Sequence, residues 1–193
     1  MINALKHIRT ILIHKWWVFY YCCKFGLYWR GIVHDLSKFH PVEFFESIKY
    51  YTGTNSPINN CKADKGYSMA WFHHRGRNKH HYEYWCDNFD KGTTCVPMPY
   101  VYATEMICDY LAAGKAYNGR TFTIRNEFDW WINSKRDNCK MHEYTKDYVT
   151  IMLDIMGNME RCNTFSNSDL RSISKRQYKL TKKLLKLWEI IEK

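Results

Sequence analysis

The chain has 193 residues, which is enough for one domain with a buried core and too few for two average domains. Apolar residues make up 46% of the sequence and aromatic residues 17%, proportions that exclude a disordered chain. The formal net charge of +10 favours anionic partners, which include nucleotides, nucleic acid and acidic membrane surfaces, but charge alone does not select among them.

The first half of the chain predicts a series of helices. Apolar residues at helical spacing predict a helix over residues 3–24, which carries His14 and ends near Gly26. A second helix is expected over residues 28–38, and a third begins at Pro41 and ends by Gly53. Residues 52–64 are rich in Asn, Thr, Gly and Pro and predict a loop.

The second half also follows the helical period. Helices are expected over residues 67–74 and 79–85, with a break at residues 75–78, and then over residues 100–117, 125–135 and 143–160. No segment alternates convincingly at period two, so strands are not expected and the fold class is all-α. Six tryptophans are assigned to the core: Trp16, Trp17, Trp71, Trp85, Trp130 and Trp131.

The C-terminal segment differs in composition. From Thr164 a polar linker leads into a helix with leucine and isoleucine on one side and many lysines and arginines on the other. Such a helix can pack on the domain, pair with a second copy or touch an anionic membrane, and the first two outcomes are the commoner ones. We therefore expect one helical domain over residues 1–160, followed by a linker and a basic amphipathic helix over residues 161–193.

The eight cysteines show no C-x-x-C pair and no regular spacing. This pattern disfavours a disulfide framework and predicts cysteines that act as small apolar core residues. The N-terminal 25 residues are apolar, but charged residues interrupt them, and the run from Trp16 to Cys23 is too short to cross a bilayer. These features predict a reduced, cytoplasmic protein without a membrane-spanning segment.

Histidines beside one another or beside aspartate are the most informative motifs. They occur as His34-Asp35, His73-His74 and His80-His81, with His14 upstream and Asp109 downstream. Imidazole nitrogens and carboxylate oxygens together suit a divalent ion, with manganese, cobalt, iron, zinc, nickel and magnesium as candidates. A carboxylate without a partner among the apolar residues around Asp109 would be costly, which favours a ligand role for it.

The order of these residues resembles the HD superfamily of metal-dependent phosphohydrolases. That superfamily has a histidine on an early helix, a His-Asp pair and a later helical aspartate, to which His14, His34, Asp35 and Asp109 correspond. The string from His34 to Lys38 is similar to the His-Asp-x-Gly-Lys form of several branches, with Ser37 where glycine is usual. The resemblance implies an HD-like helical bundle with a metal site.

Branches of the HD superfamily with two or three metals carry additional histidines between the central pair and the last aspartate. Both doublets of this chain lie in that interval, so the resemblance implies a dinuclear site, with one or both members of each doublet as ligands. The candidate ligands of this second group are His73, His74, His80 and His81.

Residues 10–155 also resemble a small family of bacterial and phage proteins that has no assigned function. The likeness is carried by residues 34–39 and 73–85. This resemblance is specific but implies little about activity.

Cations near the histidines favour a phosphorylated substrate. On a helix, Lys38 would share the face of His34, and Arg75, Arg77 and Lys79 lie between the doublets. These four residues are candidates for phosphate binding, Lys38 and Asp35 for catalysis, and Glu83, with Glu43 as a second choice, for proton transfer. The sequence thus predicts a phosphohydrolase, either a phosphomonoesterase or a phosphodiesterase, acting on a nucleotide or related phosphate ester.

Two other functions remain open on the sequence. The ligand set also resembles that of HD-type di-iron oxygenases, which use oxygen to cleave carbon–carbon or carbon–phosphorus bonds. A non-enzymatic protein that binds nucleic acid through its basic surface is the third possibility. A homo-oligomer is compatible with all three.

Overall fold

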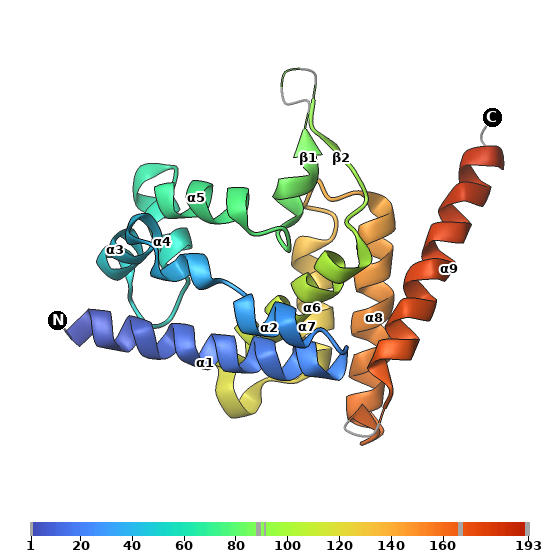
Figure 1. Ribbon diagram of the computed structural model, residues 1–193, viewed down its shortest axis with the longest axis horizontal. Helices are drawn as coiled ribbons and strands as arrows, with labels where there is room; N and C mark the ends of the chain where they lie inside the picture. The colour runs from blue at the N-terminus through green and yellow to red at the C-terminus, as the bar shows by residue number, and fades with distance from the viewer. Residues whose placement is uncertain (1, 88–89, 91, 166–167, 192–193) are drawn as a thin grey trace.

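The computed structural model describes residues 2–87, 90, 92–165 and 168–191 (Figure 1). Its architecture is all-α, which confirms the predicted fold class. Three long helices form the centre: α1 (Ile2–Lys24), α6 (Tyr100–Asn118) and α8 (Glu143–Arg161). Helix α1 packs along α6 and α2 (Tyr28–Val33), while α7 (Ile124–Trp130) packs on α8 and continues into a wider π-helical turn over Trp131–Lys135.

The core lies where α1, α6 and α8 meet. Val18 and Cys22 of α1, Leu111 of α6 and Met152 of α8 are fully buried there. Burying apolar side chains of this size is the main favourable contribution to folding, about 1.5–3 kcal/mol each for the larger aliphatic ones. The core therefore holds α6 in a fixed position against α1, and these two helices carry part of the candidate site.

The tryptophans divide between the core and the surface. Trp131 is fully buried, and its Nε1 donates a hydrogen bond to Thr150 Oγ1 at 2.8 Å. Trp16 and Trp130 are 62% and 41% exposed, so their assignment to the core was wrong. Helical periodicity places Trp16 on the outer side of α1, because His14 and Val18, which are buried, occupy the opposite side.

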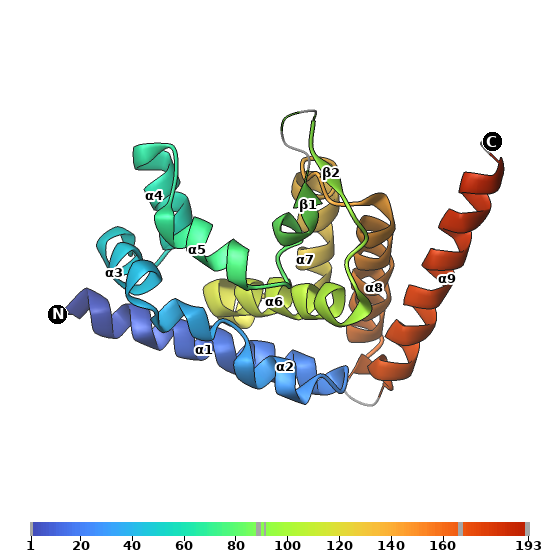
Figure 2. The same cartoon turned by 45° about the horizontal axis from the view of Figure 1, so that its top comes forward.

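Three short helices form a cluster near the N-terminal end of α1: α3 (Pro41–Tyr50), α4 (Pro57–Lys65) and α5 (Met69–Arg77). Helix α3 packs on α1, and α4 and α5 pack on α3. Helix α4 replaces the loop expected over residues 52–64, because Pro57 suits the first turn of a helix and Gly66 ends it with a φ of 79°. Helix α5 runs through the expected break at residues 75–78, since Gly76 keeps helical geometry, and it ends at Asn78. Figure 2 shows these helices together at one end of the molecule.

A short hairpin follows the second histidine doublet. After a 3₁₀ turn over Tyr82–Trp85, strands β1 (Cys86–Asp87) and β2 (Thr94–Cys95) pair antiparallel, with Cys86 opposite Cys95. A disulfide joins these two cysteines, so the expectation of unpaired cysteines and no strands was wrong here. The pairing follows from the hairpin, which brings two residues nine positions apart in the sequence face to face. Cys22, Cys61, Cys108 and Cys139 are free and buried, as expected.

Helix α9 (Leu170–Ile191) packs through its first half on α8 and α6 and then diverges from the rest of the chain (Figures 1 and 2). Tyr178 donates a hydrogen bond to the carbonyl of Met98 at 2.8 Å, which fixes the packed half. The predicted linker includes residues 166–167, which lie outside the described residues. Within the described part of the chain, no helix has the length and apolar character needed to cross a membrane.

Candidate metal centre

The His34-Asp35 pair lies in a turn between two helical segments. Helix α2 ends at Val33, His34 is extended with a ψ of 128°, and Asp35 adopts the left-handed conformation with a φ of 53°. The expected continuous helix over residues 28–38 is therefore wrong, and a 3₁₀ turn over Leu36–Phe39 follows instead. Lys15 Nζ stabilises the end of α2 by donating to the carbonyls of Ile32 and His34, at 3.1 and 2.6 Å.

Lys38 contacts Asp35 through this turn, whereas the predicted helix would have placed Lys38 on the same face as His34. Lys38 Nζ lies 2.7 Å from Asp35 Oδ2, and the Asp35 carboxylate is almost fully buried. A left-handed aspartate costs about 1 kcal/mol or more in local backbone energy, less than most residues with a Cβ would because its side chain is short and polar. The conformation aims the carboxylate at histidines from other segments.

One group of possible ligands joins helices α1 and α6 to this turn. Ligand atoms of His14, His34, Asp35 and Asp109 lie within 4.8 Å of one another. His14 Nε2 is 3.0 Å from Asp109 Oδ1, and His34 Nε2 is 3.3 Å from Asp35 Oδ2 and 3.6 Å from Asp109 Oδ1. The structure thus brings together the four residues that the sequence placed in the minimal site.

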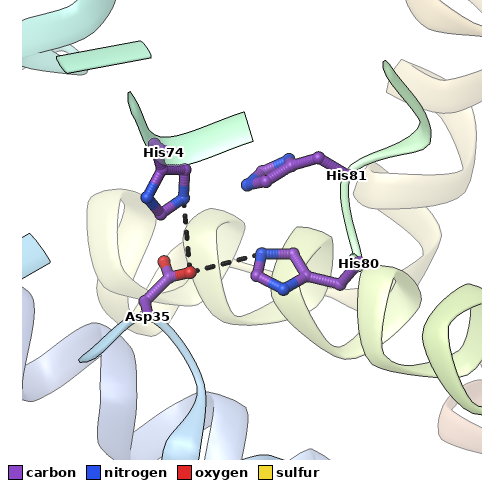
Figure 3. A group of neighbouring side chains, drawn as sticks. All are labelled: Asp35, His74, His80 and His81. Atoms are coloured by element: carbon purple, nitrogen blue, oxygen red, sulfur yellow. Dashed lines mark ion pairs between the residues drawn. The ribbon is translucent and has the colours of Figure 1, made fainter. Parts of the chain in front are cut away.

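A second group shares Asp35 with the first. It contains Asp35, His74, His80 and His81, again with ligand atoms within 4.8 Å of one another. The Nε2 atoms of His74 and His80 each lie 3.3 Å from Asp35 Oδ1, and Figure 3 shows the three imidazoles around this carboxylate. The two oxygens of Asp35 therefore face different partners, which is the arrangement that a carboxylate bridging two ions requires.

The ligand atoms fit a cation because hydrogen bonds do not satisfy them. The Nε2 atoms of His14, His34, His80 and His81 and the Oδ1 atom of Asp35 are buried without a hydrogen-bond partner. Leaving even one buried polar atom unsatisfied costs about 1–3 kcal/mol, and here several converge on a common space. These buried histidine, aspartate and glutamate groups could hold a metal ion, with donor types that suit the divalent ions expected from the sequence.

Glu105 contacts the Nδ1 atoms of two of the histidines and so orients their rings. Its Oε1 lies 3.0 Å from His34 Nδ1 and 3.4 Å from His80 Nδ1, while its Oε2 accepts a hydrogen bond from Arg30 Nε at 2.7 Å. Because a carboxylate can only accept, His34 keeps a proton on Nδ1, so Nε2 is the nitrogen that can lose its proton and bind an ion. Glu105 also belongs to a third compact group with His34 and His80.

Glu43 has the same relationship to the first histidine doublet. Its two oxygens lie 2.6 Å from His73 Nδ1 and 2.8 Å from His74 Nδ1. His74 then directs Nε2 to Asp35, whereas the ring of His73 stacks on His40 with centroids 4.2 Å apart. His73 is in none of the three ligand groups found among the described residues. Adjacent residues on a helix point about 100° apart, so only one member of this doublet faces the centre.

The electrostatics follow from this burial and pairing. Burial opposes the charge on His34 and Asp35, but the pair's mutual attraction raises the pKa of His34 and lowers that of Asp35. Asp35 does the same for His74 and raises its pKa to about 9, again against burial. Burial, with the neighbouring His80, lowers the pKa of His81. Without a cation, protons on His34 and His74 therefore balance the charge of the buried carboxylates, and an ion would displace them.

A cavity of about 170 Å³ adjoins the first group. His14, Lys38 and Asp109 contribute to its lining, together with residues of α3, α4 and α5. Its other lining residues include His7, Thr10, Glu43, Ser47, Ile58 and Tyr117. A small molecule in this cavity would contact the ligand group and Lys38 at the same time.

Four residues assigned to the site from the sequence lie away from this cavity. The Arg75 guanidinium packs over the Phe72 ring at 4.7 Å, and Arg77 donates to the carbonyl of His73 at 3.5 Å. Lys79 Nζ lies over the rings of Tyr84 and Tyr102, and Glu83 has a buried Oε2 without a hydrogen-bond partner. None of the four lines the cavity. Arg75 and Arg77 lie on α5, which continues through the segment where a break was expected, and their side chains contact the partners named above.

Sequence reasoning missed Glu105 and did not assign His7 to the site. Glu105 is fully buried on α6, four residues before Asp109 and therefore on the same side of that helix. The signal available in the sequence was a glutamate among apolar residues one turn before a proposed ligand, because a charge buried there needs a partner. His7 lies two turns before His14 on α1, also on the same side.

Comparison with known proteins identifies a family but no relative of established activity. A comparison with curated proteins found no match, and a comparison with solved structures found none either. Residues 3–155 match the sequence profile described as "Family of unknown function (DUF5662)". The matched region contains every residue of the three ligand groups and ends within α8. The chain therefore belongs to the DUF5662 family.

Proposed function

We propose that this protein is a metal-dependent phosphohydrolase of the HD type, acting on a nucleotide or related phosphate ester. The observation that carries the proposal is the shared use of Asp35 by two compact ligand groups whose buried nitrogens have no hydrogen-bond partner. The residue order that resembles the HD superfamily coincides with this spatial grouping. His14, His34, Asp35 and Asp109 would hold one ion, and Asp35, His74, His80 and His81 a second.

A bound divalent ion supplies Lewis-acid polarisation of a phosphoryl oxygen and lowers the pKa of bound water toward ~7. The residues of the chain orient the metal ligands and exclude water. Glu105 and Glu43 hold the imidazoles of His34 and His74 in the tautomer with a free Nε2. Burial of the ligand groups excludes bulk water and so strengthens electrostatic interactions with a substrate.

Lys38 is the cation best placed to act on the phosphoryl group. It lines the cavity, and the charges of Asp35 and Asp109 raise its pKa against the effect of burial, which keeps it protonated. Its ammonium would stabilise negative charge that develops on the phosphoryl oxygens during attack. Its bond to Asp35 also fixes it beside the ligand groups.

The test combines metal analysis with a hydrolysis screen. Purified protein is analysed for bound metal and then assayed, with manganese or cobalt added, on nucleoside monophosphates, nucleoside diphosphates and cyclic nucleotides. The Asp35→Asn variant is the control, because it keeps the left-handed turn while removing the charge that both groups share. The expected result is phosphate release, or opening of a cyclic nucleotide to its monophosphate, by the wild-type protein and its loss in Asp35→Asn. Equal rates in both proteins would overturn the proposal.

The same measurements separate the other functions. Bound iron together with substrate-dependent oxygen consumption and no phosphate release would instead indicate the oxygenase chemistry. Polynucleotide binding that weakens steeply with salt and survives Asp35→Asn, without any hydrolysis, would indicate a basic nucleic-acid-binding protein.

A further inference from the structure

His7 lines the cavity beside the ligand groups and has a buried polar atom without a hydrogen-bond partner. The residue is 7% exposed and lines the cavity, and its Nδ1 is buried without a hydrogen-bond partner. Its ring is held by Tyr51 and Phe44, with centroids 5.2 and 6.1 Å away. A buried polar atom without a partner is costly in the free protein, so a ligand group that enters the cavity and bonds to it would remove that cost.

The imidazole of His7 is uncharged at neutral pH. Burial, with the nearby charge of Lys38, lowers the pKa of His7 to about 4. A neutral imidazole has one donor and one acceptor nitrogen, so it pairs with hydroxyl, amide or heterocyclic groups and has no charge with which to bind a second phosphate. Its chemistry therefore differs from that of Lys38 in the same cavity.

The distance between His7 and His14 on α1 sets the length of a ligand that contacts both residues. His7 and His14 are separated by two helical turns, which is about 10 Å along the axis. A phosphoryl group near His14 and Lys38 would leave His7 facing the other end of the molecule that carries it. Between them the lining includes the apolar side chains of Ile11, Ile58 and Ala113.

The cavity does not suit a polyphosphate. Lys38 is the only lysine or arginine among the lining residues that the structure describes, and Asp109 and Glu43 add negative charge. The volume of about 170 Å³ is also below the roughly 300–1,000 Å³ of pockets that bury drug-sized ligands. One phosphoryl group and a compact organic group fit this combination of charge and size.

We propose that the cavity binds the leaving group of a phosphate monoester and that His7 selects leaving groups with an uncharged hydrogen-bonding group. This inference rests on the proposed phosphohydrolase function and narrows its substrate class. His7 is a specificity residue here, since it contacts the part of the substrate far from the reacting phosphorus. Nucleoside diphosphates and triphosphates are excluded as good substrates.

The test compares ligands that share the phosphoryl group and differ at the other end. Binding of inorganic phosphate, phenyl phosphate, ribose 5-phosphate and uridine 5′-monophosphate to manganese-loaded protein is measured by calorimetry. We expect wild-type protein to bind at least one of the two hydroxylated esters about tenfold more tightly than phenyl phosphate, the gain expected from one well-placed hydrogen bond. Uridine 5′-diphosphate should bind no more tightly than inorganic phosphate.

Two variants assign this preference to His7. His7→Phe keeps an aromatic ring against Tyr51 and Phe44 and should abolish the preference while leaving the affinity for inorganic phosphate unchanged. His7→Asn keeps a donor and an acceptor near the position of Nδ1 and should retain part of the preference. Thermal unfolding of both variants shows whether they remain folded. His7→Phe keeps the ring and removes its polar atoms, whereas His7→Asn removes the ring and keeps polar atoms. The two variants therefore distinguish an effect of side-chain packing from an effect of hydrogen bonding to the ligand.

The outcomes distinguish the two proposals. If the protein binds phosphate and hydrolyses monoesters but His7→Phe has the wild-type preference, or loses affinity equally for all ligands including inorganic phosphate, the role of His7 is refuted and the phosphohydrolase function stands. If no phosphate ester is bound or hydrolysed by manganese-loaded protein, the phosphohydrolase function fails first. Tight binding of uridine 5′-diphosphate would refute the monoester restriction.

Discussion

Glu105 Oε1 lies 3.0 Å from His34 Nδ1, and both side chains are completely buried. This contact joins α6 to the turn after α2 and places the free Nε2 of His34 toward Asp35 and Asp109. Burial opposes ionisation of Glu105, but the hydrogen bond with His34 and the nearby His80 lower its pKa to about 2. Glu105 is therefore a buried carboxylate whose charge depends on the histidines that it orients.

The first prediction is that Glu105→Gln weakens metal binding without removing a ligand. An amide can offer its own N–H to His34 Nδ1, which favours the tautomer with the proton on Nε2 and opposes coordination. We expect a loss of roughly 10–100-fold in metal affinity, measured by calorimetric titration of chelator-treated protein. Glu46→Gln is the control, because Glu46 accepts hydrogen bonds at the start of α5 and is in none of the described ligand groups.

A second prediction separates the two ligand groups. Asp109→Asn should lose about half of the bound metal, because it weakens the group that contains His14. His81→Ala should also lose about half, because it weakens the group that contains His74. Asp35→Asn should weaken both, because Asp35 belongs to each. Mass-spectrometric metal analysis gives these ratios directly, and Arg77→Ala on neighbouring α5 should keep the wild-type content. Equal metal loss in Asp109→Asn and Asp35→Asn would show that the two groups hold a single ion.

Two helical glycines, one closely packed and one open, provide a matched pair of variants for measuring the free energy of unfolding. A Cβ at Gly114 of α6 would collide with the Phe122 ring and approach Glu127 Oε2 to 2.5 Å, whereas a Cβ at Gly76 of α5 meets nothing within 4 Å. Gly114→Ala should therefore lower the free energy of unfolding by about 1–3 kcal/mol, as overpacking does. Gly76→Ala should raise it by about 0.5–1 kcal/mol, since alanine is the better helix former. Chemical denaturation of both variants measures the difference, and a stabilised Gly114→Ala would contradict the close packing.

Glu127 makes the stability depend on pH. Burial, with the charge of Asp109, raises the pKa of Glu127 from 4.5 to about 8. The folded chain then binds more protons than the unfolded chain between these values, so the free energy of unfolding falls as the pH rises through this window. Glu127→Gln removes this dependence and should stabilise the protein at pH 8 by up to about 4 kcal/mol relative to wild type, with little difference near pH 4. Denaturation at both pH values is the measurement, and a variant that is less stable at pH 8 would contradict the assignment.

Much of the fold could be predicted because helical periodicity is strong where helices are long. The helices containing His14, Asp109 and Val149 were expected within a few residues of their observed bounds. Helix α4 was missed because its residues are mostly polar and show little segregation between faces. The disulfide between Cys86 and Cys95 depends on a hairpin of only two residue pairs, which leaves no alternating pattern to detect.

The candidate site was predictable in its chemistry and less so in its geometry. The resemblance to the HD superfamily implied a site at His14, His34-Asp35 and Asp109, and the structure does bring these residues together. The position of Asp35 depends on a left-handed backbone that no local propensity enforces for the segment, so a helix was the natural but wrong expectation. The choice of His74 over His73 depends on how α5 is rotated against α3, which is a tertiary property.

The joining of α1 to α6 has a consequence for the protein during its synthesis. The ribosome synthesises a chain from its N-terminus, so His14, His34 and both histidine doublets are translated before α6. Until then they lack Glu105 and Asp109, and a nascent chain stalled ahead of Tyr100 carries loose imidazoles with no carboxylates from α6 around them. An ion bound at this centre would therefore find its full set of ligands only after translation has passed α6 and the central helices have docked.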